Sequence, residues 1–144
     1  MNNTKIRWFG ILWVGIVLLS GCGRSRTKKL LLNKRWAVTD VTPPSGTFNI
    51  EQRNRAAELK NGFYKGAWFE FLPDSVFIAS FGGKVDTAKY AIRAGGDAVA
   101  LYPRFGHNIY EQISIVKLED HQLQFNTEVA DFRMTLHLKA TPLK

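Results

Sequence analysis

From Arg35 onward, apolar and polar residues alternate along the chain with a period of two. The clearest stretch is DFRMTLHLK (131–139), in which every second residue is apolar and the residues between are polar. Because successive side chains of a strand point to opposite faces, this alternation predicts strands with one buried and one solvated face. We identify eight such segments, at residues 35–41, 67–72, 75–81, 84–93, 97–102, 110–118, 122–127 and 131–139.

The connections between these segments are mostly short and contain turn-forming residues, as in Pro73-Asp74, Gly82-Gly83, AGG (94–96) and EDH (119–121). Short turns join antiparallel neighbours, so the strands should lie side by side in sequence order. We therefore predict an all-β fold, an eight-stranded antiparallel up-and-down barrel, whose closure leaves no exposed sheet edge. The pattern NIEQRNRAAELKN (49–61) predicts one short helix between the first and second strands.

The apolar positions of the alternating segments are the candidates for the barrel interior. They are Phe69, Phe71, Ile92, Val99, Leu101, Ile113, Ile115, Leu123, Phe125, Phe132, Met134, Leu136 and Leu138. Side chains of this bulk can fill an eight-stranded barrel, although barrels of this size can also hold one small ligand. The sequence therefore leaves open whether the barrel is solid or hollow.

The first residues have the layout of a signal peptide. MNNTKIR (1–7) carries two positive charges and no negative charge, and WFGILWVGIVLL (8–19) is uncharged and mostly apolar. As a helix this run would rise about 18 Å, which is well short of the roughly 30 Å hydrocarbon core of a bilayer. We therefore expect a segment that directs export and is then removed.

The apolar run ends in Leu19-Ser20-Gly21-Cys22, which resembles the lipobox of bacterial lipoproteins. The resemblance implies that Cys22 becomes the first residue, carries a diacylglycerol thioether and has its amine acylated by a chain such as palmitate. The other interpretation is a signal peptide that leaves an unmodified cysteine. Cys22 is the only cysteine, so no disulfide can form within the chain. The expected organisation is a signal peptide (1–21), a lipidated, flexible, basic tether (22–33) and a barrel domain (34–144).

The chain has a formal net charge of +8, and four cationic residues fall in the tether: Arg24, Arg26, Lys28 and Lys29. Cations beside a lipid anchor can lie against anionic headgroups. No basic patch is interleaved with aromatic residues in the way that nucleic-acid binding requires, so we expect no nucleic-acid partner. Gly23, followed by arginine, resembles neither of the acidic sorting signals of lipoproteins, which favours anchoring in the outer membrane, facing the periplasm.

The mature chain resembles the small lipocalin-like lipoproteins of bacterial envelopes. The resemblance rests on the lipobox, Trp36 at the start of the first strand, Phe69-Glu70-Phe71 before a two-residue turn, and the pairs Tyr90/Ile92 and Val99/Leu101. It covers residues 30–140 and implies a lipocalin-like barrel with a large loop between the first two strands.

A meander allows the loops to be sorted by rim. Residues 42–66, 82–83, 103–109 and 128–130 share one rim, and the tight turns share the other. Long loops in compact domains are usually functional or disordered, so the first rim is the expected mouth. The candidate ligand-binding residues near it are Phe63, Tyr64, Trp68, Phe105, His107, Tyr110, Arg53, Arg55 and Arg104. The cations suit an anionic ligand, although they could also simply solvate an exposed helix and loop.

Catalytic and metal-binding patterns are absent from the sequence. His107, His121 and His137 lack the spacing of metal ligands, and no serine lies in a Gly-x-Ser-x-Gly context. We therefore expect no enzyme activity, cofactor or metal. The leading hypothesis is a monomeric, membrane-anchored lipocalin-like lipoprotein that binds a small hydrophobic or amphiphilic ligand, anionic by the charge of the rim. The alternative is a scaffold or inhibitor module that binds another envelope protein through residues 42–66 or the outer surface.

Overall fold

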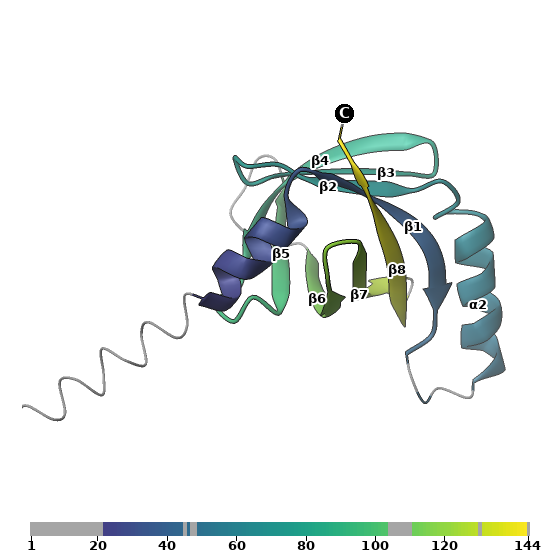
Figure 1. Cartoon of the computed structure of the whole chain (residues 1–144). Helices are drawn as coiled ribbons and strands as arrows, with labels where there is room; N and C mark the ends of the chain where they lie inside the picture. The colour runs from purple at the N-terminus through teal and green to yellow at the C-terminus, as the bar shows by residue number, and fades with distance from the viewer. Residues whose placement is uncertain (1–21, 45, 47–48, 104–110, 130, 144) are drawn as a thin grey trace, which may run out of the picture.

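The chain folds into a closed, all-antiparallel barrel of eight strands in sequence order (Figure 1). The structure, a computed structural model, describes residues 22–44, 46, 49–103, 111–129 and 131–143. Each strand pairs with its neighbours along the chain, and β1 pairs with β8 to close the barrel. The predicted fold class is confirmed, including the helix between the first two strands.

The strands and the helix lie close to their predicted positions. The strands are β1 (Lys34–Thr42), β2 (Trp68–Phe71), β3 (Val76–Phe81), β4 (Lys84–Ile92), β5 (Ala98–Pro103), β6 (Glu111–Leu118), β7 (Gln122–Val129) and β8 (Phe132–Pro142), and the helix is α2 (Ile50–Asn61). Asn49 caps α2, since its side chain accepts a hydrogen bond from the Glu51 backbone N–H at 2.9 Å. None of the helices in the described part of the chain combines the length and the hydropathy needed to cross a bilayer.

Two irregularities change which side chains face inward. The pairing of β1 with β8 shifts between Val38 and Asp40, so that Val41 faces the interior and Asp40 faces outward. The pairing of β6 with β7 shifts between Ile115 and Lys117 in the same way. Such bulges add one residue to one strand and reverse the alternation beyond it.

The outward position of Asp40 lets it form an ion pair with α2. Its carboxylate lies 2.9 Å from the Lys60 ammonium, and this interaction lowers the pKa of Asp40. Ala56 and Leu59 are the buried residues of α2. The helix therefore lies along the outside of the barrel next to β1, at the right in Figure 1.

The rim formed by the tight turns is closed by an N-terminal helix over residues 22–31. Gly23, Thr27 and Leu31, spaced four residues apart, lie on the face that packs against the barrel, because Thr27 and Leu31 are buried. The Thr27 hydroxyl donates to the Gly96 carbonyl at 2.8 Å. Beneath the helix, Trp36 is fully buried and donates from Nε1 to the Leu31 carbonyl at 3.0 Å.

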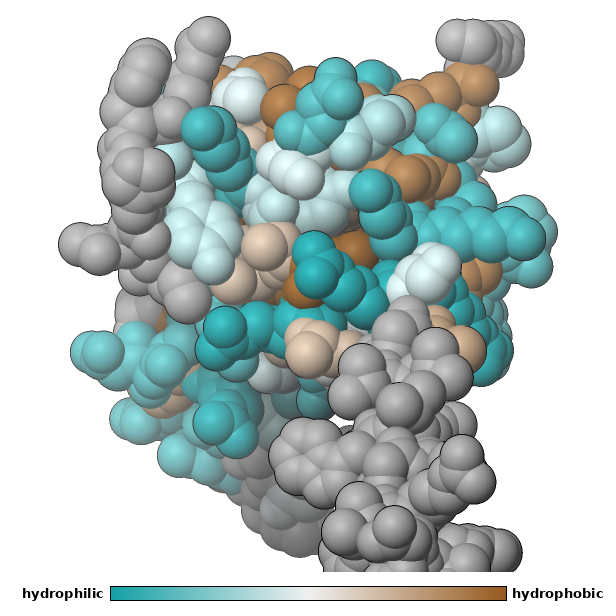
Figure 2. Space-filling view, turned by 90° about the vertical axis from the view of Figure 1, so that its left-hand side faces the viewer, coloured by the Kyte–Doolittle hydropathy of each residue, from teal (hydrophilic) through white to brown (hydrophobic). Residues whose placement is uncertain are grey.

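This helix corrects the expectation of a flexible tether over residues 22–33. The segment is helical because one face carries residues that bury against the barrel, while Arg24, Arg26, Lys28 and Lys29 remain exposed. The end of the molecule that carries the helix faces the viewer in Figure 2, and its visible side chains are mostly hydrophilic. The first strand thus begins at the closed end, as the sorting of the loops predicted.

Candidate ligand-binding site

A cavity of about 650 Å³ occupies the half of the barrel opposite the N-terminal helix. Side chains from β2 to β8 and from the segment after α2 form its wall. Its described lining residues are Phe63, Tyr64, Phe69, Phe77, Ala79, Phe81, Asp86, Thr87, Ala88, Leu101, Glu111, Gln112, Ile113, Phe125, Thr127, Glu128, Val129 and Leu136. The size lies within the range of small-molecule sites.

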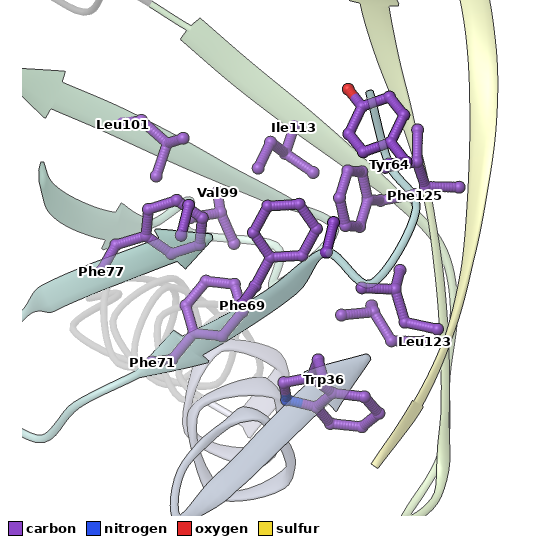
Figure 3. Close-up of a cluster of buried hydrophobic side chains, with 14 of the residues drawn as sticks. Trp36, Tyr64, Phe69, Phe71, Phe77, Val99, Leu101, Ile113, Leu123 and Phe125 are labelled. Carbon is purple, nitrogen blue, oxygen red and sulfur yellow. The ribbon is translucent and has the colours of Figure 1, made fainter. Parts of the chain in front are cut away.

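The floor of the cavity is aromatic and apolar. The Phe69 ring lies 5.7 Å from the Phe77 ring and 5.8 Å from the Phe125 ring, measured between centroids (Figure 3). Below these rings, Trp36 and Leu123 fill the barrel toward the closed end. The interior is therefore solid in one half and hollow in the other, which answers the question that the sequence left open.

The segment after α2 places two aromatic residues at the rim. The Phe63 ring lies 5.0 Å from the Tyr64 ring and 4.9 Å from the Phe81 ring. The Phe63 carbonyl accepts a hydrogen bond from the Gly82 N–H at 3.1 Å, which ties this segment to the turn between β3 and β4. Phe63 is 43 % exposed whereas Tyr64 is only 7 % exposed, so the cavity lining runs from the solvent into the barrel.

A polar cluster of Tyr64, Glu111 and Thr127 interrupts the apolar wall. The Thr127 hydroxyl is buried and donates to Glu111 Oε1 at 2.7 Å. Burial raises the pKa of Tyr64 to about 12, and the nearby negative charge of Glu111 acts in the same direction. Tyr64 therefore remains a neutral phenol at physiological pH.

The electrostatics of the described cavity wall differ from the expected basic rim. Three of its residues are acidic, namely Asp86, Glu111 and Glu128, and no lysine, arginine or histidine is among the described lining residues. Both Arg53 and Arg55 belong to α2, which lies outside the barrel, and Arg55 pairs with Glu58 at 3.0 Å. These arginines therefore do not form part of the wall.

No protein-family model matches this chain, and no curated protein matches it either.

The candidate residues divide into three groups. Phe63 and Tyr64 line the cavity, as proposed from the sequence. Trp68 does not, because it sits on the outer face of β2, where its ring centroid lies 4.0 Å from the Arg35 guanidinium carbon. Arg104, Phe105, His107 and Tyr110 lie outside the described residues.

The polar wall residues were not predicted from the sequence, although the alternation of inward and outward residues along each strand could have identified them. Asp86 shares a face with Ala88 on β4, Glu111 shares one with Ile113 on β6, and Thr127 shares one with Phe125 on β7. An inward polar residue at the rim end of a strand is a candidate ligand contact, because burial without a partner is costly.

The described residues were also considered as metal ligands. Within the described ranges, no group of three or more histidine, cysteine, aspartate or glutamate side chains could hold a metal ion. His137 Nε2 lies 2.8 Å from the Thr42 hydroxyl, in a contact between β8 and β1.

The raised pKa of Tyr64 predicts a loss of stability in alkali. A folded-state pKa of about 12, above the ordinary value of 10.0, means that folding favours the neutral phenol. The resulting stabilisation is complete below pH 10 and is lost as the pH rises toward 12. We expect Tyr64→Phe to reduce this alkaline loss in denaturant titrations and to remove a late step from the tyrosinate absorbance titration. An unchanged late step in the variant would contradict the assignment.

Proposed function

We propose that this protein is a lipid-anchored, lipocalin-like binding protein of the bacterial cell envelope that holds a small hydrophobic or amphiphilic ligand in its barrel. The observation that carries the proposal is the cavity of about 650 Å³, with an aromatic floor and a few polar groups near its rim. Sites for small molecules have this combination of apolar area and sparse, positioned polar groups. The protein acts by holding its ligand and catalyses no reaction in this proposal.

The anchor is the second part of the proposal. Cys22 is exposed and begins the N-terminal helix at the closed end of the barrel. A lipid on Cys22 would place that end toward the membrane and turn the mouth away, with outer-membrane anchoring facing the periplasm as the proposed location. Mass spectrometry of the mature N-terminus tests the anchor, and an unmodified Cys22 would overturn it.

The binding function is tested by filling the cavity. Ala79 and Ala88 are buried in its wall, so Ala79→Trp/Ala88→Trp replaces empty space with two indole rings. We expect this variant to lose at least about tenfold in affinity for the neutral fluorescent probe N-phenyl-1-naphthylamine, which corresponds to about 1.4 kcal/mol. Fluorescence titration measures the loss.

The matched control places the same rings on the outer face of the same strands. The control is Ser80→Trp/Lys89→Trp. Ser80 and Lys89 directly follow Ala79 and Ala88 in the strands, so their side chains point away from the interior. We expect this control to bind the probe like the wild type. Equal binding by all three proteins, each with a cooperative thermal transition, would exclude the cavity as the site and favour a scaffold role on the outer surface.

A further inference from the structure

The polar cluster of Tyr64, Glu111 and Thr127 restricts which ligand the cavity accepts. Thr127 already donates its hydroxyl hydrogen to Glu111 Oε1, so Glu111 retains acceptor capacity on its other oxygen. Tyr64 is 7 % exposed and lines the cavity, and its hydroxyl makes no hydrogen bond to any described residue. The cluster therefore offers acceptors to a ligand that enters between β6, β7 and the segment after α2.

The charge on the described wall has the opposite sign to that of the whole chain. Asp86 and Glu111 share the inward faces of β4 and β6 with Ala88 and Ile113, and Glu128 is a third acidic residue at the cavity, while the chain as a whole has a formal net charge of +8. Exposed charges farther away than about 8 Å are largely screened at physiological ionic strength, whereas interactions in a partly buried site are screened much less. Half-buried Glu111 is therefore the least screened charge among the described lining residues, and its charge is negative.

Aromatic rings line the same cavity as these acidic residues. Phe63, Tyr64 and Phe81 form a continuous group at the rim, with neighbouring centroids 4.9–5.0 Å apart. The faces of aromatic rings attract cations, and ammonium groups are commonly bound between such rings. Carboxylates beside aromatic rings at the rim, with an apolar floor below, match an amphiphile whose polar end is cationic.

We propose that the ligand is an amphiphile with an ammonium head group. This inference rests on the proposed binding function and names the chemical class of its ligand. The ammonium group donates to the free Glu111 oxygen and to the Tyr64 hydroxyl, while the aromatic rings at the rim contact its charge. The hydrocarbon part extends over Phe69, Phe77 and Phe125 on the floor.

Competition between three amphiphiles of equal chain length tests the head group. Decylammonium, decyl sulfate and decanol are titrated, each as a monomer in solution, against N-phenyl-1-naphthylamine bound to the full mature chain. We expect decylammonium to displace the probe at a concentration at least about tenfold lower than decyl sulfate, with decanol between them. We also expect the preference to shrink at high salt, because it is electrostatic.

Glu111→Gln tests the residue and preserves the shape of the side chain. The preference is the concentration of decyl sulfate needed to displace the probe divided by the concentration of decylammonium needed. We expect this ratio to fall at least about threefold, while the concentration of decanol needed stays the same. Glu119→Gln makes the same change of charge at the turn between β6 and β7, at the closed end, and should leave the ratio unchanged. If Glu111→Gln fails to fold, Asp86→Asn at an exposed rim position provides the same comparison.

The outcomes separate this inference from the proposed function. Binding of the probe together with equal displacement by all three amphiphiles, or a preference for decyl sulfate, overturns the ammonium head group and leaves the binding function standing. A preference for decylammonium that Glu111→Gln and Asp86→Asn leave unchanged also overturns it. Failure of the probe and of every amphiphile to bind overturns the binding function itself.

Discussion

Trp36→Ala is expected to lower the free energy of unfolding by about 3–5 kcal/mol, the range for removal of a large aromatic side chain from a core. Trp36 has no exposed surface and lies in the solid half of the barrel, with Leu31 above it. The variant would leave a large void and an unpaired Leu31 carbonyl, because the Nε1 donor is lost. Chemical denaturation followed by circular dichroism measures the change.

Two comparisons separate the contributions of packing and hydrogen bonding. Trp36→Phe retains an aromatic ring and removes the donor, so we expect a smaller loss of about 1–3 kcal/mol. Trp68→Ala removes an indole from the outer face of β2, where Trp68 is only half-buried beside Arg35, and should cost less than Trp36→Ala. A loss of less than about 1 kcal/mol for Trp36→Ala would contradict the packed half of the barrel.

Gly96→Ala is expected to destabilise the protein by about 2–4 kcal/mol and to loosen the N-terminal helix. Gly96 has φ +76°, a conformation that costs an L-residue about 1–2 kcal/mol. A Cβ on Gly96 would also lie 2.6 Å from the backbone of Gly23 and 2.8 Å from the Thr27 hydroxyl. Because backbone cannot move aside as a flexible side chain can, the helix itself would have to shift.

Gly83→Ala is the matched control, since Gly83 has φ +75° and a Cβ added there would meet no described atom within 4 Å. It should show only the conformational cost, about 1–2 kcal/mol. Hydrogen exchange of the amides over residues 22–31 then distinguishes the two variants, because only Gly96→Ala should raise the exchange rate there. If Gly96→Ala and Gly83→Ala lost the same free energy of unfolding and showed the same amide exchange over residues 22–31, the helix would not pack as described.

The strands were predictable because the alternation in this sequence is strong and its turns are short. The prediction of inward residues held for Val99, Leu123 and Leu136, each of which is at most 1 % exposed. The bulges in β1 and β6 were not predictable, because a bulge is set by the pairing with a neighbouring strand and adds no distinct residue pattern of its own.

The N-terminal helix and the cavity depend on tertiary contacts that the sequence pattern does not contain. The helix face of Gly23, Thr27 and Leu31 becomes recognisable only when the turn at Gly96 is placed beside it. Whether a barrel is hollow depends on how side chains from opposite walls meet across it. The list of inward residues could not show that Trp36 fills one half while Ala79 and Ala88 leave space in the other.

The rim residues show why charge in the sequence did not predict charge in the site. Arg53 and Arg55 are close in the chain to the mouth, but α2 carries them along the outer side of β1. Glu111 and Asp86 resemble ordinary surface acids in the sequence, yet strand register aims them inward. Proximity to the mouth in the sequence therefore did not predict which charged residues line the cavity. The inward positions of the strands predicted them better.

The packed N-terminal helix also has a mechanical consequence. Between Cys22 and the first residue of β1 there is almost no slack, because the helix is fixed to the barrel at Thr27 and Leu31. A lipid on Cys22 would therefore keep the closed end of the barrel close to the membrane surface. The barrel could swivel about the single bonds of the anchor, but no length of free peptide would let it move away from the membrane surface.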